Sequence, residues 1–321
     1  MITVVSGGVG AARFLRGLLQ VVPPTEVTAV ANVGDDIDLH GLHISPDLDT
    51  ITYTLAGAIN PETGWGLAGE SWEAMGSLRR YGGASWFNLG DRDLGTHLYR
   101  TQRLAEGASL SEDTAEIVTA WGLGFRLLPV TDDRLRTRVT VIEDGTNPGD
   151  ERVAHEVEFQ EYFVKRRHDV DVAGVHFAGA DTARPAPGVL DALTDADTIV
   201  IAPSNPLVSI DPVLAVPGVR DAVAARRDRV VAVSPIIAGA ALKGPADRLL
   251  RELGHESSVV GVAGLYADLA SALVIDEADA ELAGAVAEAG MRPVVAPTIM
   301  RDDAAAATLA TIVLDAAGGT T

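Results

Sequence analysis

Cysteine is absent from this 321-residue chain, which excludes disulfide bonds, thiolate nucleophiles and cysteine-ligated zinc sites. No apolar run approaches the roughly 20 residues that a transmembrane helix needs. The stretch from Ala196 to Pro203, for example, is interrupted by Asp197. Met1 leads directly into a predicted strand, without the basic and apolar regions of a secretory signal. We therefore expect a cytoplasmic protein that has no membrane partner.

Positive charge is also scarce, because 25 Lys and Arg residues stand against 45 Asp and Glu residues and give a formal net charge of −20. Such a surplus of negative charge repels nucleic-acid phosphates at long range, so a nucleic-acid partner is not expected. A small anionic ligand can still bind where backbone N–H groups or a metal ion reverse the local field. Lysine occurs only at Lys165 and Lys243.

The first stretch of the chain predicts a strand, a phosphate-binding loop and a helix. β-branched residues at 2–5 lead into Ser6-Gly7-Gly8-Val9-Gly10, and an apolar helical pattern resumes with Phe14 and Leu15. The N–H groups and the dipole at such a helix N-terminus bind phosphate. Arg13 replaces the third glycine of a dinucleotide fingerprint and no Gly-Lys-Ser/Thr follows, so the loop predicts an anion without identifying it. A tight turn without a ligand is the alternative.

Two acidic segments follow. Asn32-Val33-Gly34-Asp35-Asp36 comes directly after a predicted strand at 26–31, at the edge where open parallel sheets bind ligands. Ser45-Pro46-Asp47-Leu48-Asp49-Thr50 has a capping serine, proline at the first helical position and two acids in the first turn. Paired carboxylates suit a hard cation such as Mg²⁺ or Ca²⁺. An Asx-type turn and acids that complement the helix dipole explain the same residues without a ligand.

Aromatic residues make up only 5% of the chain, yet three of the four tryptophans lie between residues 64 and 88. They predict either the wall of a pocket for a flat ring or ordinary core. The helical spacing of Trp72, Met75 and Leu78 favours core for that part. Residues 88–100 place polar groups around two glycines at the start of a helix, which indicates either a second binding loop or a salt-bridged helix start.

Strand and helix patterns alternate along most of the chain and predict an α/β fold, a Rossmann-like, doubly wound and mainly parallel sheet. We expect a nucleotide-binding half with the acidic loops at 1–108. An inserted helix-plus-hairpin subdomain at 109–172, with a helix from a capping Ser111 to Trp121, helps to roof a cleft. A second α/β half at 173–321 completes the sheet.

In the second half, Ser204-Asn205-Pro206 follows a predicted strand, as ligand-binding loops do in doubly wound sheets. Lys243 lies near these loops at the start of a later helix. It is either a phosphate partner or an ordinary surface lysine.

Taken together, the motifs resemble one family in their order and spacing. The motifs are Ser6-Gly7-Gly8-Val9-Gly10, Asn32-Val33-Gly34-Asp35-Asp36, Ser45-Pro46-Asp47-Leu48-Asp49-Thr50, Leu89-Gly90-Asp91-Arg92-Asp93, Ser204-Asn205-Pro206 and Lys243-Gly244-Pro245. The family is the CofD/FbiA transferases of coenzyme F420 biosynthesis, and the resemblance covers nearly the whole chain. It implies transfer of a phosphoenolpyruvyl or 2-phospho-L-lactyl group from its guanosine diphosphate ester to the terminal ribityl hydroxyl of the deazaflavin Fo. GMP is released and (dehydro) coenzyme F420-0 is formed.

The resemblance also implies roles for individual residues. Nucleotide contacts fall on Gly8, Gly10, Ala11, Ser204, Asn205 and Lys243, and contacts to Fo fall on Asp49, Asn88, Thr96, His97 and Arg100. Asp35 and Asp49 are the implied catalytic residues and the ligands of Mg²⁺, which Ca²⁺ or Mn²⁺ could replace. Asp49 is also expected to orient or deprotonate the attacking hydroxyl. Asn88 departs from archaeal relatives, in which a lysine tends to stand at this position.

The sequence also bears on the choice of donor and on alternative functions. Val33-Gly34 and the composition rich in alanine and arginine look more like the actinobacterial branch, which implies the phosphoenolpyruvyl donor. A related family of non-catalytic regulators that bind nucleotide sugars shares the glycine loop and the paired acids, and is the chief alternative. A dinucleotide oxidoreductase is disfavoured by Arg13. For the assembly, an isologous homodimer is the base-rate expectation.

Overall fold

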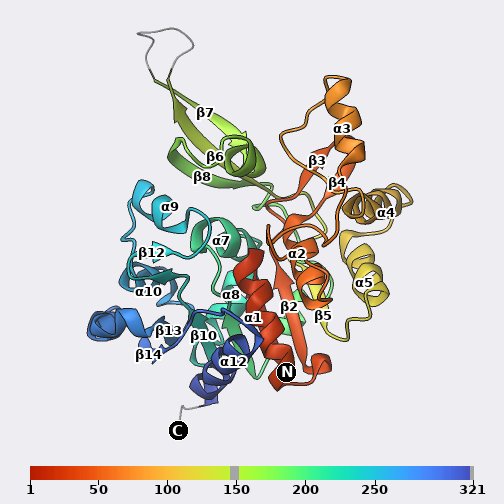
Figure 1. Cartoon of the computed structure of the whole chain (residues 1–321). Coiled ribbons are helices and arrows are strands. Elements are labelled where there is room, and N and C mark those ends of the chain that lie inside the picture. Colours follow the sequence, from red (N-terminus) through yellow and green to blue (C-terminus); the bar gives the residue numbers. More distant parts are fainter. Residues whose placement is uncertain (145–151, 319–321) are drawn as a thin grey trace.

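The central strands are short runs of β-branched and small apolar residues. In β1 (Ile2–Ser6) and β2 (Val27–Ala31) every residue is buried, as in parallel strands that helices cover on both faces. The computed structural model, which describes residues 1–144 and 152–318, places them in a seven-stranded sheet of order β14-β13-β10-β9-β1-β2-β5 (Figure 1). The other strands are β5 (Arg126–Pro129), β9 (Thr198–Ile201), β10 (Val230–Val233), β13 (Ala272–Asp276) and β14 (Arg292–Ala296).

All neighbouring strands of this sheet run parallel. The chain builds outward from β1 through β2 to β5, and then from β9, on the other side of β1, to β14. The order therefore reverses between β1 and β9. In open α/β sheets the crevice outside the carboxyl ends of the strands at such a reversal is where ligands bind. The predicted Rossmann-like fold is confirmed.

Helices cover the sheet. Helix α1 (Gly8–Val21) packs against α12 (Asp303–Gly318) in front of the sheet in Figure 1. This contact requires Gly17, because an added Cβ would lie 2.3 Å from the backbone carbonyl of Ala306. The other helices are α2 (Pro46–Leu55), α3 (Glu73–Arg80), α4 (Asp93–Ala105), α5 (Leu110–Ala120), α6 (Val189–Thr194), α7 (Asp211–Leu214), α8 (Val219–Ala224), α9 (Ala246–Glu252), α10 (Val259–Tyr266) and α11 (Ala283–Glu288). No helix among the described residues is long and apolar enough to cross a membrane.

The inserted subdomain is smaller at its start than the sequence predicts. It is an antiparallel sheet of order β7-β6-β8, formed by β6 (Arg136–Glu143), β7 (Val153–Glu158) and β8 (Asp171–Ala178). The predicted boundaries at 109 and 172 are wrong, because β5 joins the central sheet, α5 packs against it, and β8 continues beyond residue 172. Four residues of β5 are too few to show in sequence which sheet they enter.

The start of α5 also differs from the prediction. Ser109 caps the helix in place of Ser111, and it forms a capping box with Glu112. The backbone N–H of Glu112 donates to the Ser109 hydroxyl, and the Glu112 carboxylate accepts from the Ser109 backbone. A serine followed three residues later by glutamate is the usual signature of this motif, so the sequence contained the correct signal.

Residues between 37 and 94, apart from α2, form a second, smaller core beside the sheet, whereas Leu48 and Ile51 of α2 pack in the main core. An antiparallel strand pair belongs to this lobe, β3 (Ile37–Leu39) and β4 (Leu42–Ile44), which turn at His40 and Gly41 with positive φ. Ile37, Ile44, Met75 and Leu89 make its buried centre. This lobe and the inserted sheet stand on two sides of the carboxyl edge of the central sheet (Figure 1).

Candidate active site

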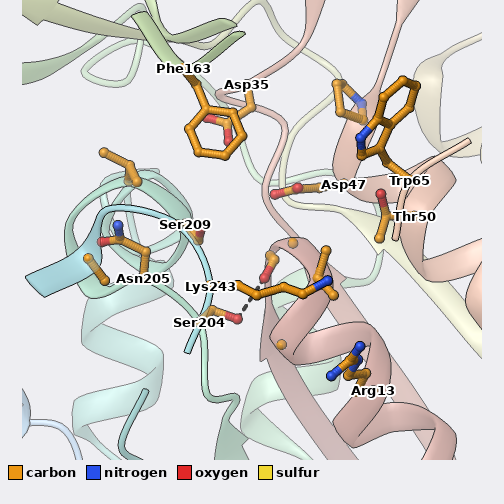
Figure 2. Close-up of a pocket in the computed structure, with 18 of the residues that line it drawn as sticks. Arg13, Asp35, Asp47, Thr50, Trp65, Phe163, Ser204, Asn205, Ser209 and Lys243 are labelled. Carbon is orange, nitrogen blue, oxygen red and sulfur yellow. Dashed lines mark hydrogen bonds between the residues drawn. The ribbon is translucent and has the colours of Figure 1, made fainter. Parts of the chain in front are cut away.

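A cavity of about 480 Å³ lies at the switch point of the sheet. Its walls come from the loop after β1, the loop after β9, the start of α2, the small lobe at 37–94 and the inserted subdomain. In Figure 2, Trp65 and Thr50 line one side, Asn205 and Ser209 line the other, and Asp47 points into the space between them, while Asp35 lies behind Phe163. Segments far apart in sequence therefore meet at the predicted edge of the sheet.

The glycine loop presents to this cavity a helix N-terminus that its own N-cap residue does not cap, although the Gly8 N–H donates to the Asp47 carboxylate. Gly7 is the N-cap of α1 and provides no side-chain cap, and no acidic residue stands in the first turn. The N–H groups of the first turn have no intrahelical partners and attract an anion. Gly8 and Gly10 line the cavity, as predicted. Gly10 also allows close packing, because an added Cβ would lie 2.0 Å from the carbonyl oxygen of Pro203.

The predicted residues of the second half reach the same space. Ser204, Asn205 and Lys243 line the cavity. The Ser204 hydroxyl donates to the carbonyl of Gly7 at 2.6 Å, and this bond joins the loop after β9 to the glycine loop after β1 (Figure 2). Lys243 extends across the cavity from the loop between β12 (Ala240–Ala241) and α9. Ala11 lies elsewhere, since it is buried in the hydrophobic core and does not line the cavity.

Arg13 and Arg301 also line the cavity, and sequence reasoning assigned neither of them a contact. Arg13 follows the glycine loop by one helical turn, so its side chain projects beside the anion site (Figure 2). Its departure from the dinucleotide fingerprint was the available signal. Together with Lys243, these arginines make one part of the cavity basic although the chain as a whole is acidic.

Asp35 and Asp47 form an acidic pair beside the glycine loop. Both line the cavity and both are buried. The Asn32 side chain donates to Asp47 Oδ2 at 3.0 Å, whereas Oδ1 of Asp35 has no hydrogen-bond partner among the described residues. Burial raises the pKa of Asp47 to about 7, an increase that hydrogen bonds from Asn32 and the Gly8 backbone only partly offset. Burial and the charge of Asp47 raise the pKa of Asp35 well above its ordinary value.

Asp49 has the opposite environment, although it also lines the cavity. Its two carboxylate oxygens accept hydrogen bonds from the Arg100 guanidinium at 3.0 and 2.5 Å. Arg100 also donates to Asp113 at 3.1 Å. Burial lowers the pKa of Arg100, but the Asp49 and Asp113 carboxylates outweigh this effect and raise the pKa above its ordinary value. Arg100 is buried behind Asp49 and does not line the cavity. It can therefore act on a molecule in the cavity only through Asp49.

Helix α4 brings the other predicted acceptor residues to this wall. His97 is buried, lines the cavity, and lies 3.4 Å from Asp93 and 3.7 Å from Asp49. The hydroxyl of Tyr53 donates to Asp93 at 2.6 Å and lies 2.7 Å from the Thr96 hydroxyl. Thr96, unlike Asn88 and His97, does not line the cavity. Thr96 therefore helps to hold the wall and is not part of its surface.

Aromatic side chains form the far side of the cavity. Trp65, Trp86 and Phe87 line it, whereas Met75 lies in the small core. The aromatic segment therefore contributes both to a pocket wall and to a hydrophobic core, through different residues. The inserted subdomain adds Phe163 to the lining of the cavity. The alternation that predicted the insert's strands does not indicate that the segment following β7 turns into the cavity.

The acidic pair fits a divalent cation that substrate phosphates help to bind. No group of three or more His, Asp or Glu side chains in residues 1–144 and 152–318 could hold a metal ion alone. Mg²⁺ commonly binds to one or two carboxylates together with substrate phosphates. The unpartnered Oδ1 of Asp35, the uncompensated charge of Asp47 and the adjacent anion site satisfy that requirement.

A parallel sheet with a glycine-rich helix N-terminus, buried carboxyl groups and basic side chains at its switch point is typical of α/β proteins that bind phosphate-containing small molecules. The family model described as "2-phospho-L-lactate transferase CofD" matches residues 2–312. The chain therefore belongs to the CofD family, and it is a transferase of that family.

Individual relatives agree with this membership. The phosphoenolpyruvate transferase of Kitasatospora aureofaciens is 47% identical over 312 residues, which cover 96% of this chain and 95% of that protein. The phosphoenolpyruvate transferase of Mycolicibacterium smegmatis is 42% identical and covers 99% of this chain and 98% of its own length. A solved structure of a UPF0052 family member from Bacillus halodurans has a TM-score of 0.61 at 16% identity, with 98% of each chain covered. That likeness concerns the fold alone.

Proposed function

We propose that the protein transfers a phosphoenolpyruvyl group from its guanosine diphosphate ester to the terminal ribityl hydroxyl of the deazaflavin Fo, in the biosynthesis of coenzyme F420. The hydroxyl oxygen forms a bond to the phosphorus nearest the three-carbon acid, and the bond from that phosphorus to GMP breaks. The hydroxyl proton is released, and GMP leaves with the electron pair of the broken bond. The product is a phosphodiester, dehydro coenzyme F420-0.

One observation supports this reaction more than any other: a single cavity joins three different environments. The N-terminus of α1 suits a diphosphate, the acidic pair suits a cation, and Trp65 and Trp86 offer a surface for a flat ring system. A transferase of this kind must bind a nucleotide ester and an aromatic acceptor at once. Transfer then depends mainly on alignment and on stabilising charge.

In this proposal the glycine loop, Ser204 and Lys243 bind the nucleotide, and Asn88 and His97 contact the acceptor. Asp35 and Asp47 would hold Mg²⁺. This pair takes the place of Asp35 and Asp49, which are the ligands expected from the sequence. When bound, the ion would supply charge neutralisation at the diphosphate. Asp49 keeps its role at the acceptor: Arg100 holds its carboxylate in one orientation, from which it accepts a hydrogen bond from the ribityl hydroxyl.

The choice of donor rests on the relatives. Phosphoenolpyruvate transferase is the name of each of the proteins at 42% to 47% identity. The 2-phospho-L-lactyl ester, which differs by two hydrogens, is the donor named in the description of the family model. Because both three-carbon acids carry the same carboxylate and phosphate, discrimination between them depends on small differences in shape.

Mass spectrometry of the product tests the proposal. Purified protein is incubated with Mg²⁺, Fo and each donor ester in turn, and the reaction is followed for GMP and for the phosphodiester. We expect the dehydro product from the phosphoenolpyruvyl ester at a rate well above that from the lactyl ester. Binding of nucleotide without release of GMP from either ester would contradict the transfer and favour a non-catalytic nucleotide-binding regulator.

A further inference from the structure

Two carboxylates behind the aromatic wall cap two helices in a reciprocal way. Glu70 precedes α3 but caps α4, because its oxygens accept from the backbone N–H groups of Arg92 at 2.7 Å and Asp93 at 2.9 Å. Asp91 precedes α4 but caps α3. It accepts from the backbone N–H groups of Glu73 at 2.9 Å and Ala74 at 3.1 Å. The loop before each helix thus accepts hydrogen bonds from the free N–H groups at the start of the other helix.

Further contacts join the same two loops. The Ser71 hydroxyl donates to Asp91 at 2.6 Å, and the Asp91 backbone N–H donates to the Ser71 carbonyl at 3.0 Å. The Arg92 guanidinium donates to the carbonyl of Ala68. Gly90 leaves room for this arrangement, because an added Cβ would lie 2.0 Å from the carboxyl carbon of Glu70. We call Glu70 and Asp91, with these backbone partners, the reciprocal clamp.

The reciprocal clamp lies outside the cavity but between residues that form it. Neither Glu70 nor Asp91 lines the cavity. Trp65 lies on the loop that Glu70 ends, and Asn88 lies just before Asp91. Residues of the segment at 88–93, for which the sequence allows a binding loop, therefore have two different roles. Asn88 and Asp93 reach the cavity, whereas Asp91 turns toward the backbone of α3.

From this geometry we propose that Glu70 and Asp91 are positioning residues that fix the tryptophan side of the acceptor site relative to the Asn88 and His97 side. The proposal rests on the proposed function, since it concerns the binding of Fo. The clamp sets the width of the part of the cavity that takes a flat ring. None of its hydrogen bonds to helix N–H groups reaches the glycine loop, so we expect the nucleotide side to be unaffected by its loss.

Steady-state kinetics of Glu70→Ala and Asp91→Ala test the proposal. We expect the KM for Fo to rise about fivefold or more, as for loss of a helix cap, while the KM for the donor ester stays within twofold of wild type. Glu73→Ala is the matched control, because this exposed acid lies in the same segment and contributes only its backbone N–H to the clamp. An unchanged KM for Fo, or an equal rise in both KM values, would overturn the proposal.

Gly90 provides a second test that a general loss of stability cannot imitate. Gly90→Ala displaces the Glu70 side chain and is expected to raise the KM for Fo as Glu70→Ala does. In the double variant the Gly90 substitution should add almost nothing, because no carboxylate remains to be displaced. Additive effects would show that the two residues act separately and would contradict the clamp.

Amide hydrogen exchange separates the clamp from the proposed function. If wild type neither binds nor converts Fo, the proposed function fails, yet exchange still reports on the loops. Glu70→Ala is expected to increase exchange at 64–72 and at 88–95 together, with α1 unchanged. An increase confined to the loop that carries the substitution would overturn the clamp whatever the activity.

Discussion

Asp47 and Asp49 lie two residues apart in the first turn of α2, are both buried and both line one cavity, yet their surroundings are opposite. Asp49 is held by the Arg100 guanidinium. Asp47 faces Asp35, and its hydrogen bonds to Asn32 and the Gly8 backbone do not bring a positive side chain to it. One carboxylate is therefore neutralised by the protein, and the other is left for a ligand to neutralise.

The difference teaches that the role of an acid at a helix start depends on remote segments. Arg100 comes from α4, about fifty residues beyond Asp49, and Asp35 comes from the loop after β2. Helix-dipole complementarity applies equally to both acids and does not distinguish them. Burying two carboxyl groups without a positive partner is costly, and the raised pKa values of Asp35 and Asp47 are typical of functional sites.

The largest expected effect is on the neutralised side. Arg100→Met would leave Asp49 and Asp113 buried without their partner, and we expect the free energy of unfolding to fall by about 3–5 kcal/mol. Chemical denaturation measures this. Arg103→Met is the control, because Arg103 pairs with Glu116 at the surface and its loss should cost no more than about 1 kcal/mol. An equal fall in the free energy of unfolding for both variants would show that the buried ion pairs contribute no more to stability than the surface pair.

The next effect is on the unneutralised side. Asp47→Asn preserves shape but removes charge from the acidic pair, and we expect kcat with Mg²⁺ to fall at least about a hundredfold. Initial rates of GMP release measure it, with circular dichroism as the check on folding. Asp38→Asn is the control, since Asp38 pairs with Arg134 and Arg136 and does not line the cavity. A rate near that of wild type would remove Asp47 from the chemistry.

A smaller effect concerns pH. The pKa of Asp47 is about 7 in the folded protein against 3.8 for a free side chain. The folded state therefore retains a proton that the unfolded state loses, so Asp47 lowers stability as pH rises from about 4 toward 7, by at most about 1.4 kcal/mol per unit. Thermal unfolding in EDTA across this range measures the slope. Asp47→Asn should flatten it, and an identical slope in the variant would contradict the raised pKa.

The sequence was sufficient for the sheet and the glycine loop, and most of the predicted site residues line the cavity. Regular alternation and a glycine-rich turn after the first strand are local signals, and local signals determined those elements. The boundary at 109 was wrong because the pairing of β5 with β2 is a long-range property.

The charge pattern of the site depended on tertiary contacts. Nothing near Asp49 in sequence indicates that Arg100 will bind it. Trp65 and Met75 share one aromatic segment, but the turn between them sends one to the wall and the other to the small core. These outcomes follow from packing between distant elements, which a single sequence does not display.

Calorimetric titration of Mg²⁺ into the GDP complexes of wild type, Asp47→Asn and Asp49→Asn tests the assignment of the acidic pair most directly. We expect wild type and Asp49→Asn to bind the ion with similar affinity, and Asp47→Asn to bind it at least about tenfold more weakly. Loss of binding in Asp49→Asn, with Asp47→Asn unchanged, would contradict the assignment and restore Asp35 and Asp49 as the metal ligands.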